Sequence, residues 1–174
     1  GKDYIQQLQD KMDEIGVGKI ASLSGRYYAM DRDNNWDRVQ KAYDSLTKGE
    51  GVQAENAVQA MEDSYAKEVT DEFVLPTVIT ENGKPLSVVK ENDSVIFFNF
   101  RPDRAREMTR AFCDDKFTGF DRPFIKTTFV CFKDYDETIP NKLIAFEKEH
   151  ITNTFGEYLA KCGKKQLRLA ETEK

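Results

Sequence analysis

Histidine is nearly absent from this chain, and so are the residue groupings that usually carry catalysis. The 174 residues include one histidine, His150, in an acidic stretch where a surface position is expected. No HxxxH, DxxxH or CxxC pairing occurs, which argues against a self-contained transition-metal site. No G-x-S-x-G, P-loop or GxGxxG sequence occurs either. From these absences we expect no catalytic nucleophile and no metal ligand in this segment.

The chain also lacks an excess of positive charge and any long apolar stretch. Its 26 Lys and Arg residues face 31 Asp and Glu residues, which gives a net charge of −5 and a pI near 5.1. A surface that binds nucleic acid or anionic membrane needs a basic face. No run approaches the roughly 20 apolar residues of a spanning helix, and no signal-peptide pattern opens the chain. We therefore expect no nucleic acid and no membrane among the partners, and a cytoplasmic location.

Cysteine is scarce and odd in number. The three cysteines are Cys113, Cys131 and Cys162. Without a CxxC spacing, they favour free buried thiols in a reducing cytoplasm over a disulfide framework. With 39% hydrophobic and 33% charged residues the chain is expected to fold, and its length suits one domain, or one domain and part of another.

What the chain does have is a concentration of arginine in two short segments. The first arginine segment is Gly25–Asp33, the second is Asn99–Arg106, and their arginines are Arg26, Arg32, Arg101, Arg104 and Arg106. Each segment follows an apolar run expected to be a strand and precedes an amphipathic helix. Ligands bind at the carboxyl ends of strands in open α/β sheets. The segments therefore predict a site for a small anion such as a phosphate or carboxylate.

The second arginine segment carries the stronger physical argument. Pro102 suits the first position of a helix, because its missing N–H group is unpaired there in any case. Cations at this positive end of the helix dipole cost about 0.3–1 kcal/mol each, so an anionic ligand would explain them. The alternative is a surface ion-pair cluster around Asp103 and Glu107. The residues by themselves leave both interpretations open.

Hydrophobic spacing predicts an α/β protein, which we expect to be a three-layer αβα fold with a mostly parallel or mixed sheet. The expected helices span residues 3–15, about 36–46, 54–67, 102–113 and about 154–162. The expected strands span 18–24, 73–75, 78–80, 94–100, 124–132 and 166–170. A turn is expected at 81–85 between two of these runs.

Six motifs follow one another along the whole chain. They are residues 8–12 (LQDKM), 24–33 (SGRYYAMDRD), 36–43 (WDRVQKAY), 70–76 (TDEFVLP), 97–106 (FFNFRPDRAR) and 168–174 (RLAETEK). In this order they closely resemble the cofactor-independent phosphoglycerate mutases. These are the 2,3-bisphosphoglycerate-independent, metal-dependent isomerases of the alkaline phosphatase superfamily.

The resemblance implies substrate-binding roles for five residues. Arg26 and Arg32 match the two arginines of the family's G-R-Y-Y-x-M-D-R motif, which contact substrate. Arg101 and Arg104 match the pair in the F-R-P-D-R motif, which reach the bound phosphoglycerate. Lys174 matches the lysine that ends A-E-T-E-K and faces the phosphoryl group from the phosphatase side. It is the one residue here with a possible contact to the reacting group.

The resemblance also implies what this segment does not contain. The family's serine nucleophile, a substrate-binding histidine and most metal ligands have no counterpart in the chain. Residues 1–147 would form most of the substrate-binding phosphotransferase domain, and residues 148–174 would lead back into the phosphatase domain. Two Mn²⁺ ions are implied for the full-length enzyme and none for this segment. Arg106 matches no substrate residue of the family, so for it the ion-pair interpretation stands.

The function implied is part of a glycolytic isomerase. The whole enzyme would interconvert 3-phosphoglycerate and 2-phosphoglycerate through a phosphoserine intermediate, and would be a monomer. This segment would hold the glycerate and phosphate with its arginines and be inactive alone. The alternative is a stand-alone, non-catalytic binding module for phosphorylated acids.

Overall fold

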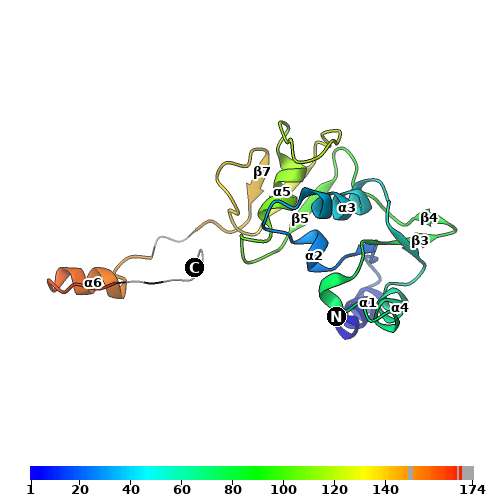
Figure 1. Cartoon of the computed structure of the whole chain (residues 1–174), viewed down its shortest axis with the longest axis horizontal. Helices are drawn as coiled ribbons and strands as arrows, with labels where there is room; N and C mark the ends of the chain where they lie inside the picture. Colours follow the sequence, from blue (N-terminus) through cyan, green and yellow to red (C-terminus); the bar gives the residue numbers. More distant parts are fainter. Residues whose placement is uncertain (149–150, 168, 170–174) are drawn as a thin grey trace.

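The chain contains both helices and strands in a computed structural model that describes residues 1–148, 151–167 and 169 (Figure 1). In chain order the elements are α1 (Lys2–Ile15), β1 (Ser22–Leu23), α2 (Arg26–Ala29), α3 (Trp36–Thr47), β2 (Val52–Ala54), α4 (Ala57–Ala66), the 3₁₀ helix η1 (Asp71–Phe73), β3 (Thr77–Glu81), β4 (Lys84–Pro85), β5 (Ser94–Phe97), α5 (Arg106–Cys113), β6 (Thr128–Cys131), β7 (Lys142–Ile144) and α6 (Phe155–Lys161). The α/β class expected from the hydrophobic pattern is confirmed.

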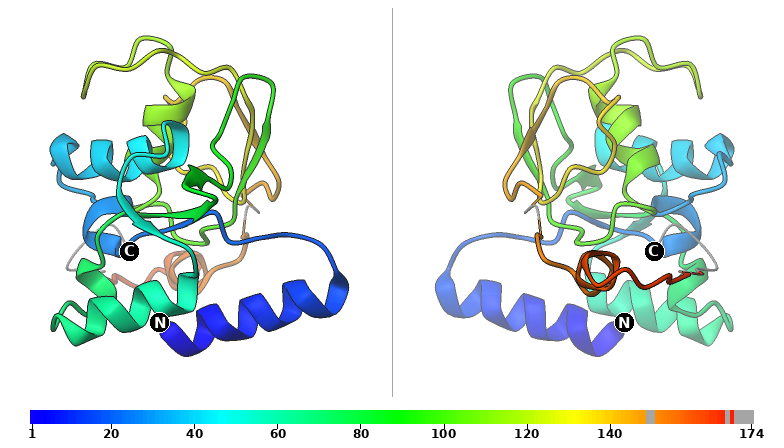
Figure 2. Two further views of the ribbon diagram at one scale, coloured as in Figure 1. Left: turned by 90° about the vertical axis from the view of Figure 1, so that its right-hand side faces the viewer. Right: turned by 90° about the vertical axis from the view of Figure 1, so that its left-hand side faces the viewer.

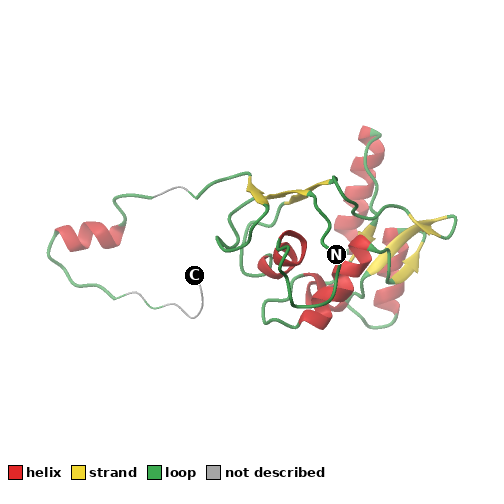
Figure 3. Cartoon of the chain, turned by 90° about the horizontal axis from the view of Figure 1, so that it is seen from above, coloured by secondary structure: helices red, strands yellow, loops and turns green. Residues whose placement is uncertain are grey.

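The strands form two separate small sheets, which Figure 3 shows as two groups. In the first sheet the order is β1-β3-β2, with β2 parallel to β3 and β1 antiparallel; β4 also pairs antiparallel with β3. The second sheet has the order β5-β6-β7 and is parallel throughout. The expectation of a single sheet between two helix layers is therefore corrected. A tight turn at Asn82 and Gly83, both at positive φ, folds the chain back onto β3, and the next strand then starts a new sheet.

The main core lies between the helices α3 and α5 and one face of the second sheet. Its buried residues are Val39, Ala42, Tyr43, Ala105, Met108, Ala111, Phe112, Cys113, Phe129, Cys131, Tyr135 and Ile139. Ring centroids lie 4.8 Å apart between Tyr43 and Phe112, and 5.5 Å apart between Phe112 and Phe129. Because α5 packs on both α3 and the sheet, the second arginine segment is held against the first.

The other face of the second sheet carries exposed apolar side chains. Ile96 is 65% exposed, Phe98 72% and Leu143 56%. Parallel sheets usually have both faces covered, because their strands are apolar on both sides. In the described part of this chain helices cover one face only.

Two helices form a smaller unit beside the first sheet. In Figure 2 α1 and α4 meet near the N-terminus, where Lys2 joins them through its amide to the Tyr65 hydroxyl and through its ammonium group to Glu62. The expected apolar face of α1 is only partly covered, since Leu8 and Ile15 remain about half exposed.

Several local expectations need correction. Residues 73–75, expected as a strand, end η1 and continue as irregular backbone ahead of β3. Pro102 does not begin α5: its carbonyl oxygen accepts hydrogen bonds from the amides of Ala105 and Arg106, at 3.0 and 3.2 Å, and forms a turn before the helix. Arg101 therefore precedes a turn and Arg104 lies within it, and the helix proper begins at Arg106.

The last described element stands apart from the rest of the molecule (Figure 1). Thr154 begins α6 with a full capping box that includes Glu157, as its sequence suggests. Phe155 and Tyr158 are exposed, and so is Cys162, which corrects the expectation of three buried thiols. Of the strand expected over 166–170, residues 166, 167 and 169 are not in a strand, and the remaining two lie outside the described residues.

Candidate anion-binding site

Two of the arginines predicted to bind an anion meet on a single carboxylate. Nη1 of Arg32 and Nη2 of Arg101 each lie 3.2 Å from Oδ2 of Asp103. The Asp103 side chain is 18% exposed, whereas those of Arg32 and Arg101 are 42% and 64% exposed. Burial acts to raise the pKa of Asp103, but the Arg101 charge and the hydrogen bond from Arg32 hold it below the usual range. Two guanidinium groups from distant segments thus already hold one carboxylate between them.

Arg104 completes this cluster from the same turn. Its Nη1 donates to the carbonyl oxygen of Met30 at 2.8 Å, a bond that crosses 74 residues of sequence. The two arginine segments are therefore linked by a carboxylate that they share and by a direct side-chain to backbone bond. We call Arg32, Arg101, Arg104 and Asp103 the arginine cluster.

Arg26 contacts a different part of the molecule. It is the first residue of α2, and its Nη2 lies 2.8 Å from Oε2 of Glu72 in η1. The preceding Gly25 donates its amide to Val74 at 2.8 Å, and a Cβ atom there would lie only 2.3 Å from the Glu72 carbonyl oxygen. The close backbone approach at Gly25 thus sets where Arg26 emerges. The structure brings Arg32, Arg101 and Arg104 together and directs Arg26 to η1.

The carboxylate of Asp31 organises the loop that carries Arg32. Asp31 is 4% exposed and accepts hydrogen bonds from the amides of Asp33 and Asn35, at 3.0 and 2.9 Å, and from the Asn35 side chain at 3.0 Å. Its Oδ1 also lies 3.4 Å from Nη1 of Arg38 on α3. Burial acts to raise the pKa of Asp31, but these hydrogen bonds outweigh it and lower the pKa.

A second buried carboxyl group reaches the same loop from α5. Glu107 is 7% exposed, and its Oε1 accepts the amide of Asn34 at 2.9 Å. Burial, followed by the nearby Asp31 and Asp33 charges, raises the pKa of Glu107 to about 7. One of the two interpretations left open by the sequence placed Glu107 in a surface ion-pair cluster, and its burial contradicts a surface position. Its position four residues before the buried Ala111 was the available signal, because such residues share one face of a helix.

The buried Tyr135 and the partly buried Arg106 fix the ends of the second arginine segment. Tyr135, 1% exposed, donates its hydroxyl to the carbonyl oxygens of Phe97, at 2.9 Å, and Asn99, where β5 gives way to the segment. Arg106, which closes the segment, donates Nε to the Tyr135 carbonyl oxygen at 2.9 Å. The backbone on either side of Arg101 and Arg104 is thus anchored to one loop residue.

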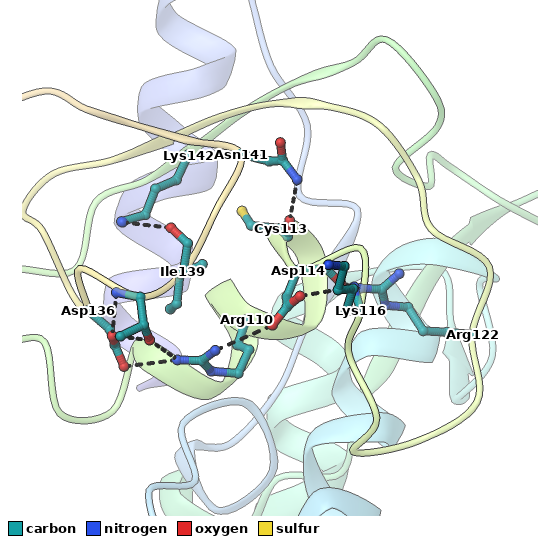
Figure 4. Close-up of polar contacts among 10 residues, drawn as sticks. Arg110, Cys113, Asp114, Lys116, Arg122, Asp136, Ile139, Asn141 and Lys142 are labelled. Atoms are coloured by element: carbon teal, nitrogen blue, oxygen red, sulfur yellow. Dashed lines mark hydrogen bonds and ion pairs between the residues drawn. The ribbon is translucent and has the colours of Figure 1, made fainter.

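The far end of α5 is held by a polar network that Figure 4 shows in close-up. Arg110 lies between Asp114 and Asp136, at 3.3 and 3.0 Å. Beyond it, the Asn141 side chain donates to the Cys113 carbonyl oxygen at 3.0 Å. These contacts join α5 to the loops on both sides of β6. They make the helix a fixed support for the arginine cluster.

Two further features of the described residues concern metal binding and thiol reactivity. No group of three potential metal ligands occurs within residues 1–148, 151–167 and 169. Burial raises the pKa of Cys113 to about 12 and that of Cys131 to about 11, so neither is a thiolate nucleophile near neutral pH. Lys174, the fifth residue expected to bind substrate, lies outside the described residues. No helix in the described ranges has the length and apolar character needed to span a membrane.

Known proteins resemble the chain over its whole length. The 2,3-bisphosphoglycerate-independent phosphoglycerate mutase of Lachnoclostridium phytofermentans is 64% identical over 176 residues, which cover 100% of this chain and 34% of that protein. The protein of that name from Clostridium perfringens strain 13 is 58% identical over 174 residues, with the same coverage of both chains. The chain therefore spans about a third of the length of these relatives.

The fold matches a solved structure as well. A crystal structure of Leishmania mexicana phosphoglycerate mutase at low cobalt concentration superimposes with a TM-score of 0.77 and 31% identity, covering 93% of this chain and 31% of that one. A sequence profile of the family described as BPG-independent PGAM N-terminus (iPGM_N) matches residues 1–137. The chain, with its two arginine segments joined through Asp103 and Met30, belongs to the N-terminal family of the 2,3-bisphosphoglycerate-independent phosphoglycerate mutases.

Proposed function

We propose that this chain is the substrate-holding part of an isomerase that interconverts 3-phosphoglycerate and 2-phosphoglycerate through a phosphoserine. The observation that carries the proposal is the Asp103 carboxylate held between Arg32 and Arg101. An arrangement that holds one carboxylate between two guanidinium groups has the geometry to receive the carboxylate or phosphate of a phosphoglycerate. Family membership supplies the substrate class.

The proposed roles follow from where the side chains lie. Arg32 and Arg101 are the more exposed members of the cluster and take the anionic groups of the substrate. Arg104 is bonded to Met30, so it orients the site and adds positive charge. Arg26 contacts the substrate from the η1 side, and Lys174 contacts the phosphoryl group. Each role stabilises negative charge that oxygen atoms carry during phosphoryl transfer.

The reaction itself requires groups that other parts of such an enzyme would provide. The proposal assigns residues 1–147 to most of the substrate-binding domain and 148–174 to the connection with a phosphatase domain. A serine nucleophile and two Mn²⁺ ions would belong to that second domain. The carboxylates described here do not form a metal site, because Asp31 and Asp103 are already bonded to backbone amides and arginines.

Titration of the 174-residue chain with 3-phosphoglycerate in a calorimeter tests the holding role. We expect binding that weakens at least about tenfold in Arg101→Ala, the size expected when a charge-assisted hydrogen bond is lost. Lys11→Ala, which removes one positive charge from an exposed ion pair on α1, is the matched control and should bind normally. Absence of heat at millimolar ligand, or equal loss in both variants, would contradict the proposal.

A chimaera tests the catalytic part of the proposal. The matching third of the Lachnoclostridium phytofermentans enzyme would be replaced by this chain, and mutase activity would be assayed with 3-phosphoglycerate. We expect activity that Arg101→Ala reduces strongly. A chimaera that folds and binds 3-phosphoglycerate but does not isomerise it would instead favour the alternative of a non-catalytic binding module.

A further inference from the structure

Two buried carboxyl groups adjoin the arginine segments, and the proposed anion-binding role uses neither of them. Asp31 and Glu107 are 4% and 7% exposed. Asp31 belongs to the first arginine segment, and Glu107 directly follows the second. A buried ionised carboxylate costs several kcal/mol unless donors surround it. The hydrogen-bond donors around each of these two carboxyl groups therefore help to set the shape of the site.

Glu107 ties the two arginine segments together through the loop that follows Arg32. Its Oε1 accepts the amide of Asn34, whose φ of 60° lies in the left-handed region. Asp31 holds the residues on either side of Asn34 by accepting the amides of Asp33 and Asn35. The loop is thus held at three consecutive amides, two by its own segment and one by α5.

The second oxygen of Glu107 lacks a donor. Oε2 is fully buried and has no hydrogen-bond partner in the described ranges. Its close neighbour is the carboxylate of Asp31, and the Asp33 charge lies nearby. Arg38 on α3 pairs with Asp31. Two further arginines close to Glu107 in the sequence donate to backbone carbonyl oxygens: Arg104 to that of Met30 and Arg106 to that of Tyr135.

A proton carried by Glu107 itself would supply the missing donor. A neutral carboxyl group can give its O–H to Asp31, which leaves one shared negative charge instead of two that repel each other. Arg38 then balances that single charge.

We propose that protonated Glu107 is a positioning residue, which fixes the loop carrying Arg32 against the turn carrying Arg101 and Arg104, so that loss of its proton weakens the binding of phosphoglycerate. The inference deepens the proposed function and rests on it for the identity of the ligand. Loss of the proton would place two like charges side by side under the loop and lower the positive potential of the cluster. Both effects disfavour an anion. The raised pKa of Glu107, about 7, puts this change near neutral pH.

The test compares the wild-type chain with Glu107→Gln between pH 5.5 and 8.5. Glutamine keeps an oxygen to accept the Asn34 amide and has N–H donors for Asp31, but it cannot ionise. Calorimetric titration with 3-phosphoglycerate should give equal affinities at pH 5.5, and an affinity about fivefold or more higher for the variant at pH 8.5, a usual size for coupling between sites. The phosphate of the ligand also titrates near pH 6, and the ratio of the two affinities removes this contribution. If the affinities of wild type and Glu107→Gln for 3-phosphoglycerate kept a constant ratio from pH 5.5 to pH 8.5, the proposal would be overturned.

A second readout does not depend on the ligand. In ¹³C-labelled chain the Glu107 carboxyl carbon should titrate near pH 7, and the Asn34 amide signal should shift with the same midpoint in wild type but not in Glu107→Gln. An Asn34 amide that ignores the Glu107 titration would overturn the positioning role, even if 3-phosphoglycerate binds. If the amide follows Glu107 but 3-phosphoglycerate binds neither protein, the positioning of the loop stands and the proposed function falls.

Discussion

Nη1 of Arg104 donates to the carbonyl oxygen of Met30 at 2.8 Å, and this bond joins the turn before α5 to the end of α2. Arg104 is half-buried. A bond from a charged donor typically contributes about 1.5–3 kcal/mol when it is shielded from water. Arg104 therefore acts on both the stability of the fold and the charge of the site.

Replacement of Arg104 by alanine should lower both stability and binding. We expect a loss of about 1–2 kcal/mol in the free energy of unfolding, measured by urea denaturation, because the Met30 carbonyl oxygen loses its donor. Affinity for 3-phosphoglycerate should fall as well, because the two segments are less firmly joined. An unchanged urea midpoint would show that the bond does not hold the segments together.

Replacement of Arg101 by alanine should separate binding from stability. The Arg101 side chain is 64% exposed, so its ion pair with Asp103 contributes at most about 1 kcal/mol to folding. Affinity for 3-phosphoglycerate should nevertheless fall about tenfold, whereas the melting temperature should change little. Retained affinity together with a clear drop in melting temperature would point to a purely structural arginine.

The stability of the chain should decrease between about pH 4.5 and pH 7 because of Glu107. Its pKa is raised from 4.5 to about 7, so in this window the folded chain binds more protons than the unfolded chain. Folding is therefore favoured at the acidic end of this window. As the pH rises from 4.5 to 7, the free energy of unfolding falls by up to about 3 kcal/mol. Asp31 acts in the opposite sense below its ordinary value of 3.8, because its pKa is lowered.

Urea denaturation at several pH values would measure this loss. Glu107→Gln should flatten the pH dependence of the free energy of unfolding between pH 4.5 and pH 7. It should leave the loss of stability in stronger acid unchanged. A wild-type curve and a variant curve that run parallel would contradict an ionisable role for Glu107.

Replacement of Gly25 by alanine should destabilise the first arginine segment. The φ of Gly25 is −67°, which suits alanine, so the cost is steric. The added Cβ would lie 2.3 Å from the Glu72 carbonyl oxygen and 2.7 Å from the Val74 nitrogen, and neither backbone atom can move without disturbing η1. We expect a loss of about 1–3 kcal/mol in urea denaturation. Ser24→Ala is a suitable control, since the Ser24 hydroxyl bonds only to the neighbouring Gly25 carbonyl oxygen among the described residues.

The exposed face of the second sheet should bind apolar probes. Ile96 and Phe98 lie on this face and are 65% and 72% exposed. The isolated chain should enhance the fluorescence of anilinonaphthalene sulfonate and self-associate at high concentration, and Phe98→Ser should reduce both effects. Sedimentation velocity gives the second measurement. If Phe98→Ser matched the wild type in probe fluorescence and in self-association, this face of the sheet would not be the surface that causes them.

Local patterns in the sequence predicted the helices better than the strands. The 3.6-residue spacing of apolar positions predicted α1, α3 and α4 to within three residues at each end, because such a pattern depends only on near neighbours. Strands depend on partners elsewhere in the chain. Residues 73–75 look like a strand, yet form none because Val74 bonds to Gly25 without a sheet ladder around it.

The sequence by itself determined the family and singled out the arginines proposed to hold an anion, because their motifs can be read directly from it. Only the tertiary structure decided how those residues are arranged. The meeting of Arg32 and Arg101 on Asp103 spans 71 residues, and no local spacing encodes such a contact. The packing of α5 between α3 and the second sheet buries Glu107 beside Asp31 and so raises its pKa. Burial and long-range contact arise from packing, so the arrangement and electrostatics of the site appear only once the chain has folded.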